Sequence, residues 1–313
     1  MTVKFIDCPV FLADLYTADL QIIVPNLQLQ TGDPPRQKVM KLLRNCRFAM
    51  NDHTEMDAQL LASCKKLKSI IFMGTGASSY IDLGAAERLG IGVRTIRGYG
   101  DRSVAEHAIA LMFAAGRKIA EMDRAVRRGK WQALDSIEFS GKTLGVIGTG
   151  GIGSETVRIG SALGMKVVAW NRSGIADSLP CEELLLDEVI TSADVVTLHL
   201  ALTHETKGLL DARRMALMSK NAILINTARG GLVDEPALIA ALKAQRISHA
   251  ALDVFAEEPM VFGHPLTVLE NVTLTAHAGF MTREASKRLL RMALEVLAEE
   301  ISSSGTGSQG EIS

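Results

Sequence analysis

The stretch TLGVIGTGGIGSETVRIGSALGMKVVAWNR, residues 143–172, joins two short apolar runs through a glycine-rich turn and a helix-forming segment. Its glycines have the spacing Gly148-x-Gly150-x-x-Gly153. After a strand, the first glycine permits a tight turn, the second lets the backbone approach a pyrophosphate, and the third lets a helix lie close. The helix then offers unpaired N–H groups and its positive dipole end to phosphates. The spacing alone is weak evidence, but its position between two apolar runs predicts a dinucleotide-binding turn.

The second apolar run ends in Asn171, Arg172 and Ser173, and no acid stands there. An Asp or Glu at this point binds the ribose 2′-hydroxyl of NAD and repels a 2′-phosphate. A guanidinium instead forms charge-assisted bonds to phosphate, and an amide and a hydroxyl beside it can donate further bonds. The alternative is a solvated arginine, but that leaves an NAD ribose without its usual acceptor. We therefore predict NADP(H) as the preferred cofactor, with NAD(H) as the second candidate.

Composition excludes several classes of protein. A chain of 313 residues, 47% of them hydrophobic, is long enough for two domains. Lys plus Arg (34) nearly balance Asp plus Glu (35), which disfavours nucleic acid as a partner. The four cysteines lack C-x-x-C or zinc-site spacing, so we predict no metal and buried, reduced thiols at Cys8, Cys46, Cys64 and Cys181. The N-terminus does not read as a signal peptide, and no apolar run approaches the ~20 residues of a membrane helix. We expect a cytoplasmic protein without a membrane segment.

Short β-branched runs alternate with helix-period segments, which predicts parallel sheets covered by helices. The candidate strands before the glycine-rich break at 95–103 are Val3–Asp7, Arg47–Met50, Lys68–Met73 and Gly92–Thr95. The candidate helices there are Met56–Cys64 and Leu83–Leu89. A single long helix is predicted over Val104–Gly129, and Asp101 or Ser103 could cap it.

Strand and helix signals are most regular after Lys142. Six strands, the number in a complete dinucleotide-binding sheet, are predicted at Thr143–Ile147, Lys166–Trp170, Val195–Leu198, Ala222–Asn226, His249–Asp253 and Val272–Thr275. A last helix is predicted from Thr282 to about Glu300. The polar tail SSSGTGSQGEIS, residues 302–313, has little reason to fold.

Three side chains of chemical interest follow predicted strands: Arg229 in INTARGG, Glu258 in ALDVFAEEP and His277 in LTAHAGF. Open α/β sheets bind their ligands at the carboxyl ends of strands. An arginine can grip a carboxylate, a histidine can exchange a proton near neutral pH, and a glutamate can orient the imidazole. Taken singly, each residue could equally close a turn or face solvent. Together, downstream of a dinucleotide turn, they favour the reduction of a 2-oxo acid.

The chain resembles the D-isomer-specific 2-hydroxyacid dehydrogenases, including the glyoxylate and hydroxypyruvate reductases. The matching motifs, in order, are SVAEHAIALM, LGVIGTGGIG, LHLALTHETKGLLD, INTARGGLVDEPALIAAL, ALDVFAEEP and LTAHAGFMTREA, and the resemblance covers roughly residues 68–300. It implies an α/β fold of two doubly wound parallel-sheet domains. A Rossmann cofactor domain, 99–280, would be inserted into a smaller flavodoxin-like substrate domain, 1–98 plus 281–313. It also implies a homodimer joined through the cofactor domains, with the 104–129 helix reaching across.

The resemblance assigns roles to residues. Arg229 would bind the substrate carboxylate and oxo group, His277 would be the acid/base and Glu258 its partner. The implied cofactor-binding residues are Val104, Gly148, Gly150, Gly151, Ile152, Gly153, Asn171, Arg172, Ser173, Thr227, Ala228, Arg229, Asp253, His277 and Gly279.

The substrate-binding candidates lie early in the chain. Gly74, Thr75 and Gly76 would present N–H groups to the substrate carboxylate, in a loop that is one residue longer than usual, so the register of Ala77–Tyr80 stays open. Asn51 and His53, in the loop MNDHT, are candidates for specificity, with a plain surface loop as the alternative. Among the remaining histidines, His107 reads as structural, and no partners are evident for His199, His204, His249 and His264.

These observations favour a nicotinamide-dependent enzyme acting on a small 2-oxo or 2-hydroxy acid. The low aromatic content (4%) and the polar MNDHT loop suggest a substrate such as glyoxylate or hydroxypyruvate. One alternative is a non-enzymatic nucleotide-sensing interaction protein, which would have no physical need for the Arg229, Glu258 and His277 set. Another is a dinucleotide-fold enzyme of a different class, such as a hydrolase of an adenosyl thioether, which would not explain these three positions.

Overall fold

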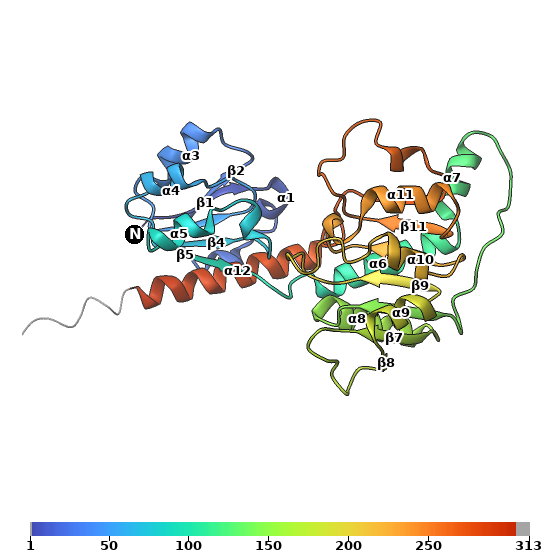
Figure 1. Cartoon of the computed structure of the whole chain (residues 1–313). Helices are drawn as coiled ribbons and strands as arrows, with labels where there is room; N and C mark the ends of the chain where they lie inside the picture. The colour runs from blue at the N-terminus through green and yellow to red at the C-terminus, as the bar shows by residue number, and fades with distance from the viewer. Residues whose placement is uncertain (1, 305–313) are drawn as a thin grey trace, which may run out of the picture. The chain divides into compact units, whose positions relative to one another are not determined.

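The computed structural model describes residues 2–304, and the chain divides into two compact units (Figure 1). Unit 1 comprises Met1–Gly100 and Thr282–Ser313, and unit 2 comprises Asp101–Met281. The sequence placed the two breaks after residues 98 and 280. Each unit is a parallel α/β sheet covered by helices on both faces, which confirms the predicted fold class.

Unit 1 contains a five-stranded parallel sheet in the order β2-β1-β3-β4-β5, the flavodoxin-like order. Its strands are β1 (Val3–Cys8), β2 (Leu27–Thr31), β3 (Phe48–Asn51), β4 (Ser69–Phe72) and β5 (Gly92–Thr95). Strand β2 was not predicted. It lies at the sheet edge with Leu27 as its one buried residue, so its sequence LQLQT carries little apolar signal.

Two layers of helices cover this sheet (Figure 1). One face packs against α1 (Val10–Ala13), α2 (Ala18–Gln21) and α12 (Arg283–Ser303). The other packs against α3 (Arg36–Leu43), α4 (Ala58–Ser63) and α5 (Leu83–Arg88). Strand residues alternate between these layers, as Phe5 and Ile6 do, because successive side chains of a strand point to opposite faces.

The last helix, α12, begins where the sequence predicted and ends later. The Thr282 side chain accepts a hydrogen bond of 3.1 Å from the backbone N–H of Ala285, which is an N-cap interaction. The helix extends to Ser303, so the first two serines of the polar tail are helical. Ser304 is the C-cap of the helix, and residues 305–313 lie outside the described residues.

Unit 2 contains a seven-stranded parallel sheet in the order β12-β11-β10-β9-β6-β7-β8. Its strands are β6 (Thr143–Ile147), β7 (Lys166–Trp170), β8 (Glu182–Glu183), β9 (Val195–Leu198), β10 (Ile223–Asn226), β11 (His249–Leu252) and β12 (Val272–Leu274). Counted from β6, this is the Rossmann order 3-2-1-4-5-6 with a seventh strand at one edge. The six predicted strands are present. The prediction missed β8, because two exposed glutamates form no apolar run.

Helices again form two layers around this sheet (Figure 1). Helices α6 (Asp101–Gly116) and α8 (Gly151–Ala162) pack on one face. The other face is covered by α9 (Leu186–Ser192), α10 (Ala212–Leu217) and α11 (Glu235–Lys243). The central strands are buried on both faces, so they read as continuous apolar runs that sequence analysis detects.

The prediction of one helix over Val104–Gly129 was wrong. The chain forms α6 and then a separate helix α7 (Ile119–Arg127), with Lys118 between them at φ +52°. Helix α6 begins at Asp101, so neither Asp101 nor Ser103 caps it. After α7 the chain returns to the end of α6, where a Cβ on Gly116 would lie 2.3 Å from the Phe139 ring.

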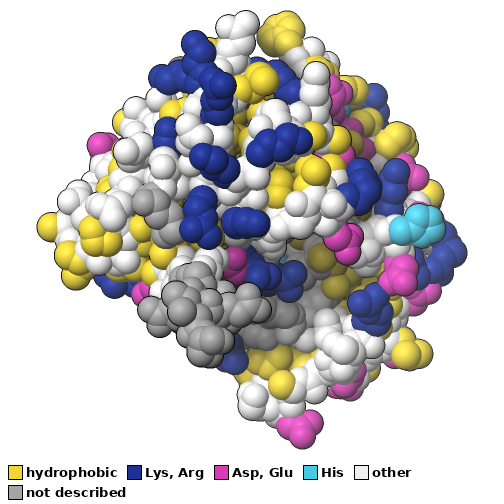
Figure 2. All heavy atoms as spheres, turned by 90° about the vertical axis from the view of Figure 1, so that its left-hand side faces the viewer, with side chains coloured by type: hydrophobic (Ala, Val, Ile, Leu, Met, Phe, Trp, Pro, Cys, Tyr) yellow, Lys and Arg dark blue, Asp and Glu magenta, His cyan; other side chains and the backbone are white. Residues whose placement is uncertain are grey.

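On the face shown in Figure 2, Lys and Arg side chains are spread among uncharged and hydrophobic ones rather than gathered in one patch. Within residues 2–304, no helix has both the length and the hydrophobicity needed to cross a membrane.

Candidate active site

The glycine-rich turn joins β6 to α8 and leaves an open space at its tip. Gly148 has φ +96°, and a Cβ there would lie 2.6 Å from the carbonyl oxygen of His199. A Cβ on Gly153 would lie 1.8 Å from the carbonyl oxygen of Gly148, so the helix can approach the turn only without a side chain. At Gly150 a Cβ would meet nothing within 4 Å. The backbone therefore forms a cradle beside the N-terminus of α8, which fits a pyrophosphate.

Two buried polar atoms that follow strands of this sheet lack a hydrogen-bond partner among the described residues: Nδ1 of His199 and Oγ1 of Thr227. They follow β9 and β10. Strand β9 lies next to β6 in the sheet order, and β10 lies on the other side of β9. Burial lowers the pKa of His199 to about 4, so its ring is neutral at neutral pH. Unpaired buried polar atoms at the carboxyl ends of strands are consistent with a polar ligand such as a dinucleotide.

Asn171 is engaged by the protein itself. Its Nδ2 donates to Ser173 Oγ (3.0 Å) and to the Gly174 carbonyl (2.8 Å), and its Oδ1 accepts from the backbone N–H of Thr149 (3.3 Å). The amide thus ties the end of β7 to the glycine-rich turn. Because Ser173 accepts from Asn171, its own hydroxyl proton is left to donate to a ligand.

The Arg172 guanidinium has a carboxylate partner that the sequence did not indicate. Its Nη1 lies 2.5 Å from Oε2 of Glu205, and both side chains are exposed, at 76% and 70%. Glu205 stands in the loop after β9, 33 residues further along the chain. Sequence analysis missed it because only the sheet order brings these two loops together.

Arg229 lies in the turn just after β10, and the last residue of that strand, Asn226, holds the turn through hydrogen bonds. The buried Asn226 accepts a hydrogen bond from the N–H of Ala228 (3.0 Å) and donates one to the carbonyl of Arg229 (2.9 Å). A Cβ on the next residue, Gly230, would lie 1.9 Å from the carbonyl carbon of Phe255. The turn of Arg229 therefore lies directly against the backbone that leads to Glu258.

Glu258 and His277 are in contact. Glu258 Oε2 lies 2.6 Å from His277 Nδ1, and Glu258 Oε1 accepts from the N–H of Phe255 (2.9 Å). His277 follows β12 with φ +51°, a left-handed conformation that is uncommon for a residue other than glycine. Both side chains are partly exposed, at 40% for His277 and 34% for Glu258, so a ligand could reach the second ring nitrogen.

The buried Asp253 holds the loop that carries His277. Its carboxylate accepts from the N–H groups of Ala278 and Gly279, both at 2.9 Å, and from Thr275 Oγ1 at 2.5 Å. His107 Nε2 lies 3.0 Å from Thr275 Oγ1 and 3.3 Å from Asp253 Oδ1. Burial raises the pKa of Asp253, but these hydrogen bonds outweigh it and lower that pKa to about 2.

The remaining cofactor candidates lie around these groups. Gly151 and Ile152 form the first turn of α8. A Cβ on Gly151 would lie 1.8 Å from Asp101 Oδ2, and one on Gly279 would lie 3.6 Å from the Val104 side chain.

Residues 109–279 match the model of the NAD binding domain of the D-isomer specific 2-hydroxyacid dehydrogenases. The chain belongs to this dehydrogenase family. Over 277 residues it is 40% identical to a glyoxylate reductase of Aeropyrum pernix, covering 84% of this chain and 82% of that protein. Over 280 residues it is 36% identical to a hydroxypyruvate reductase of Thermotoga maritima, covering 88% and 91%.

A solved structure extends the likeness over nearly the whole chain. The acyclic imino acid reductase Bsp5, in complex with NADPH and D-Arg, has a TM-score of 0.85 at 28% identity, covering 97% of this chain and 98% of that one. The family assignment makes this protein an oxidoreductase that uses a nicotinamide cofactor. It confirms the resemblance seen in the sequence.

Two specificity candidates of the dehydrogenase, both in unit 1, have partners within the protein. Asn51 is fully buried, and its amide donates to the Thr54 carbonyl and accepts from the Thr54 N–H, both at 3.0 Å. The two ring nitrogens of His53 lie 2.8 Å from Asp52 and 2.5 Å from Asp33. Burial disfavours the charged His53 ring, but these carboxylates outweigh it and raise its pKa.

The Gly74–Gly76 loop follows strand β4. Gly74 has φ +152° and its carbonyl accepts from the N–H of Ile96 at 2.9 Å. Thr75 is exposed, and its N–H has no acceptor among the described residues. Residues Ala77–Ser79, whose register the sequence left open, form a short 3-10 helix.

Most of the cysteines of the dehydrogenase are buried, and three of its other histidines have hydrogen-bond partners within the protein. Cys8, Cys46 and Cys64 are buried as predicted, whereas Cys181 is only partly buried. Three of the histidines have partners that the sequence did not show: His199 with Thr197 Oγ1 (2.9 Å), His249 with Thr273 Oγ1 (2.9 Å) and His264 with Glu235 Oε1 (3.2 Å). Residues 2–304 contain no group of three or more His, Cys, Asp or Glu side chains that could hold a metal ion.

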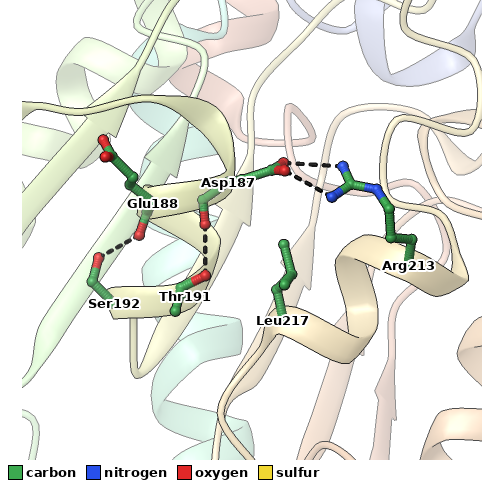
Figure 3. Close-up of a pocket in the computed structure, with 6 residues that line it drawn as sticks. All are labelled: Asp187, Glu188, Thr191, Ser192, Arg213 and Leu217. Atoms are coloured by element: carbon green, nitrogen blue, oxygen red, sulfur yellow. Dashed lines mark hydrogen bonds and ion pairs between the residues drawn. The ribbon is translucent and has the colours of Figure 1, made fainter.

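A surface pocket of about 420 Å³ lies between α9 and α10 of the dehydrogenase (Figure 3). Asp187 accepts hydrogen bonds there from Arg213 and Arg214, which lower its pKa to about 2. Figure 3 shows Leu217 beside this ion pair. None of the predicted site residues lines the pocket, and we interpret the ion pair as a tie between two helices.

Proposed function

We propose that this protein reduces a small 2-oxo acid to the D-2-hydroxy acid, with NADP(H) as the preferred cofactor. The observation that carries the proposal is the 2.6 Å contact between Glu258 and His277, at the end of a strand in a dehydrogenase of this family. A carboxylate beside one ring nitrogen accepts a hydrogen bond from it and orients the imidazole. The protonated ring can then act as an acid through its other nitrogen, Nε2. A protein that only senses nucleotides would gain nothing from this pair.

Each of the three residues has its own role in the proposed reaction. A nicotinamide cofactor, when bound, would supply a hydride to the substrate C2. Arg229 holds the substrate carboxylate and draws electron density toward the oxo oxygen. His277 Nε2 gives that oxygen a proton, and Glu258 holds the ring in position for the transfer. Hydride and proton together convert the oxo group to a hydroxyl, and in the reverse direction His277 takes the proton back.

The cofactor preference rests on Arg172 and Ser173. The guanidinium and the hydroxyl proton of Ser173 are the donors we assign to the 2′-phosphate, whereas the amide of Asn171 is held by the protein. The family model is named for NAD and the Bsp5 complex contains NADPH, so both cofactors occur among relatives. Comparing kcat/KM for NADPH and NADH tests the proposal. Equal values, or an Arg172→Ala variant that loses nothing with NADPH, would refute it.

Glyoxylate or hydroxypyruvate is the proposed substrate. The similarity to a glyoxylate reductase and to a hydroxypyruvate reductase supports this choice. The candidates in unit 1 are Gly74, Thr75, Gly76 and His53, whereas Asn51 holds its own loop. A panel of 2-oxo acids at fixed pH decides the matter, and a strong preference for a large aromatic oxo acid would contradict the proposal.

The assembly is proposed to be a homodimer through unit 2. Helix α7 has no buried residue, and Trp131 just beyond it is 94% exposed. Apolar side chains that a single chain leaves uncovered often mark an interface. Analytical ultracentrifugation of the protein and of a Trp131→Lys variant tests this, with a monomeric wild type as the contrary result. The cytoplasmic location stays a prediction of the sequence.

A further inference from the structure

Glu205 places a carboxylate beside Arg172. In NAD-binding sheets an acid at the end of the second strand binds the ribose hydroxyls, and the end of β7 has none. The loop after β9 supplies Glu205 instead, with its Oε2 2.5 Å from Arg172 Nη1. Strands β7 and β9 flank β6 on its two sides. The pair therefore joins the two loops on either side of the strand that ends in the glycine-rich turn.

The position of Glu205 is set by its own turn. Thr206 Oγ1 donates to the Ala201 carbonyl (2.7 Å) and accepts from the N–H of Thr203 (2.8 Å). On the other loop, Asn171 fixes the residues around Arg172. Both charged side chains thus extend from turns that hydrogen bonds hold in place.

We propose that Glu205 is a cofactor-selectivity residue that weakens binding of NADP(H) and strengthens binding of NAD(H). This inference rests on the proposed function, in which Arg172 binds the 2′-phosphate. A 2′-phosphate would draw Arg172 away from Glu205 and place two like charges near each other, which opposes binding. A ribose 2′-hydroxyl can instead donate to the Glu205 carboxylate while Arg172 neutralises it. The chain thereby accepts both cofactors, with a smaller preference for NADP(H) than Arg172 alone would produce.

The expected effect is modest because both side chains are exposed. Ion pairs at such positions contribute about 0.2–1 kcal/mol, which corresponds to at most about a fivefold change in a dissociation constant. Glu205→Gln should therefore lower the dissociation constant of NADPH about two- to fivefold and raise that of NADH by a similar factor. Added salt should reduce the difference, since screening weakens exposed charge pairs.

The test measures binding directly, by the fluorescence of NADPH and NADH titrated with the full-length protein. The variants are Glu205→Gln, Arg172→Ala and the control Glu87→Gln, which removes the same charge from an exposed position in unit 1. Calorimetric titration with 2′,5′-ADP and 5′-AMP repeats the comparison on the ribose end alone. We expect Glu205→Gln to lower the dissociation constant of 2′,5′-ADP. The control variant should leave the dissociation constants of both ligands unchanged.

The results separate this inference from the function on which it rests. If Arg172→Ala weakens NADPH but Glu205→Gln matches the control, the selectivity role of Glu205 is wrong and the NADP(H) proposal stands. If Arg172→Ala leaves NADPH binding unchanged, the NADP(H) proposal fails and this inference fails with it. If Glu205→Gln weakens both cofactors equally, Glu205 supports the loop without selecting between them, which also overturns the inference.

Discussion

Asp253 holds the backbone of Gly279 through a hydrogen bond of 2.9 Å from the glycine N–H to Oδ2. The same residue binds the two preceding N–H groups, of Ala278 through its carboxylate and of His277 through its carbonyl oxygen. One aspartate thus engages three consecutive N–H groups. This explains how His277 keeps a left-handed backbone, which costs free energy in a residue with a Cβ.

Replacing Asp253 by asparagine should loosen this loop. The amide has one acceptor oxygen, so at least one of the backbone N–H groups loses its partner, and buried unpaired groups cost about 1–3 kcal/mol each. We expect lower thermal stability and a lower kcat. Asp234→Asn, at the exposed N-cap of α11, is the matched control. Unchanged kcat in Asp253→Asn would contradict this role.

The Asp253 carboxylate makes the free energy of unfolding depend on pH. The pKa of Asp253 is about 2 in the folded protein, below its ordinary value of 3.8. The contribution of this carboxylate to the free energy of unfolding is therefore present above about pH 4 and is lost as pH falls from there towards 2. The shift corresponds to about 2 kcal/mol. Urea unfolding between pH 5 and 2 should show a shallower loss of stability in Asp253→Asn than in the wild type.

His107 should act as a positioning residue for the His277 loop. Because Thr275 donates to the Asp253 carboxylate, its oxygen accepts from His107 Nε2, which must carry a proton. His107→Leu removes this donor, and a hydrogen bond in a charged network contributes about 1.5–3 kcal/mol. We expect kcat to fall about tenfold with little change in KM. His107→Gln keeps an N–H donor and should recover much of kcat, whereas equal losses in both variants would indicate a packing role only.

The acid role of His277 is tested by His277→Ala. General acid catalysis contributes typically ~10²–10⁴-fold, so kcat should fall by about that factor. The dissociation constant of NADPH, measured by fluorescence, should change little. Turnover close to that of the wild type would contradict the assignment of His277.

Glu258→Gln should lower the rate of reduction. The neutral amide can still accept from His277 Nδ1, but its hydrogen bond is weaker than that of a carboxylate and holds the ring less firmly. We expect a lower kcat with little change in the dissociation constant of NADPH. Steady-state rates and cofactor fluorescence measure this, and an unchanged kcat would remove Glu258 from the mechanism.

His249 should contribute to stability at neutral pH. Burial, then the charges of Lys118 and Arg124, lower its pKa to about 4 from 6.5. A neutral buried ring stabilises the folded state above about pH 6.5, and this contribution of about 3 kcal/mol is lost as pH falls towards 4. His249→Gln should flatten the loss of unfolding free energy over that interval. The exposed His204→Gln should leave it unchanged.

Much of the fold was predictable because its central strands are buried on both faces. Runs such as those at β6 and β10 are continuously apolar, and the glycine spacing between β6 and α8 is set by local contacts. The edge strands β2 and β8 bury few side chains, so they have no pattern to detect. The break at Lys118 has no proline or glycine at its centre, and a helix-forming sequence continues across it.

The places of Arg229 and His277 in the fold were predictable from the sequence. Arg229 and His277 each follow an apolar run, so sheet geometry alone places them at the same edge. The partner of Arg172 was not predictable, because Glu205 reaches it from a loop that only the order of β7, β6 and β9 brings close. The sequence also did not indicate that Asn51 and Asn171 bind their own backbone, as amides in turns often do.

The close contact at Gly230 limits which substitutions this enzyme can accept. Any other residue at that position would place its Cβ 1.9 Å from the Phe255 carbonyl carbon, inside the backbone of the neighbouring loop. A directed-evolution library that randomises the turn around Arg229 would lose nearly every member altered at position 230. Broadening the substrate range should therefore start from side chains that no backbone encloses, such as the exposed Thr75.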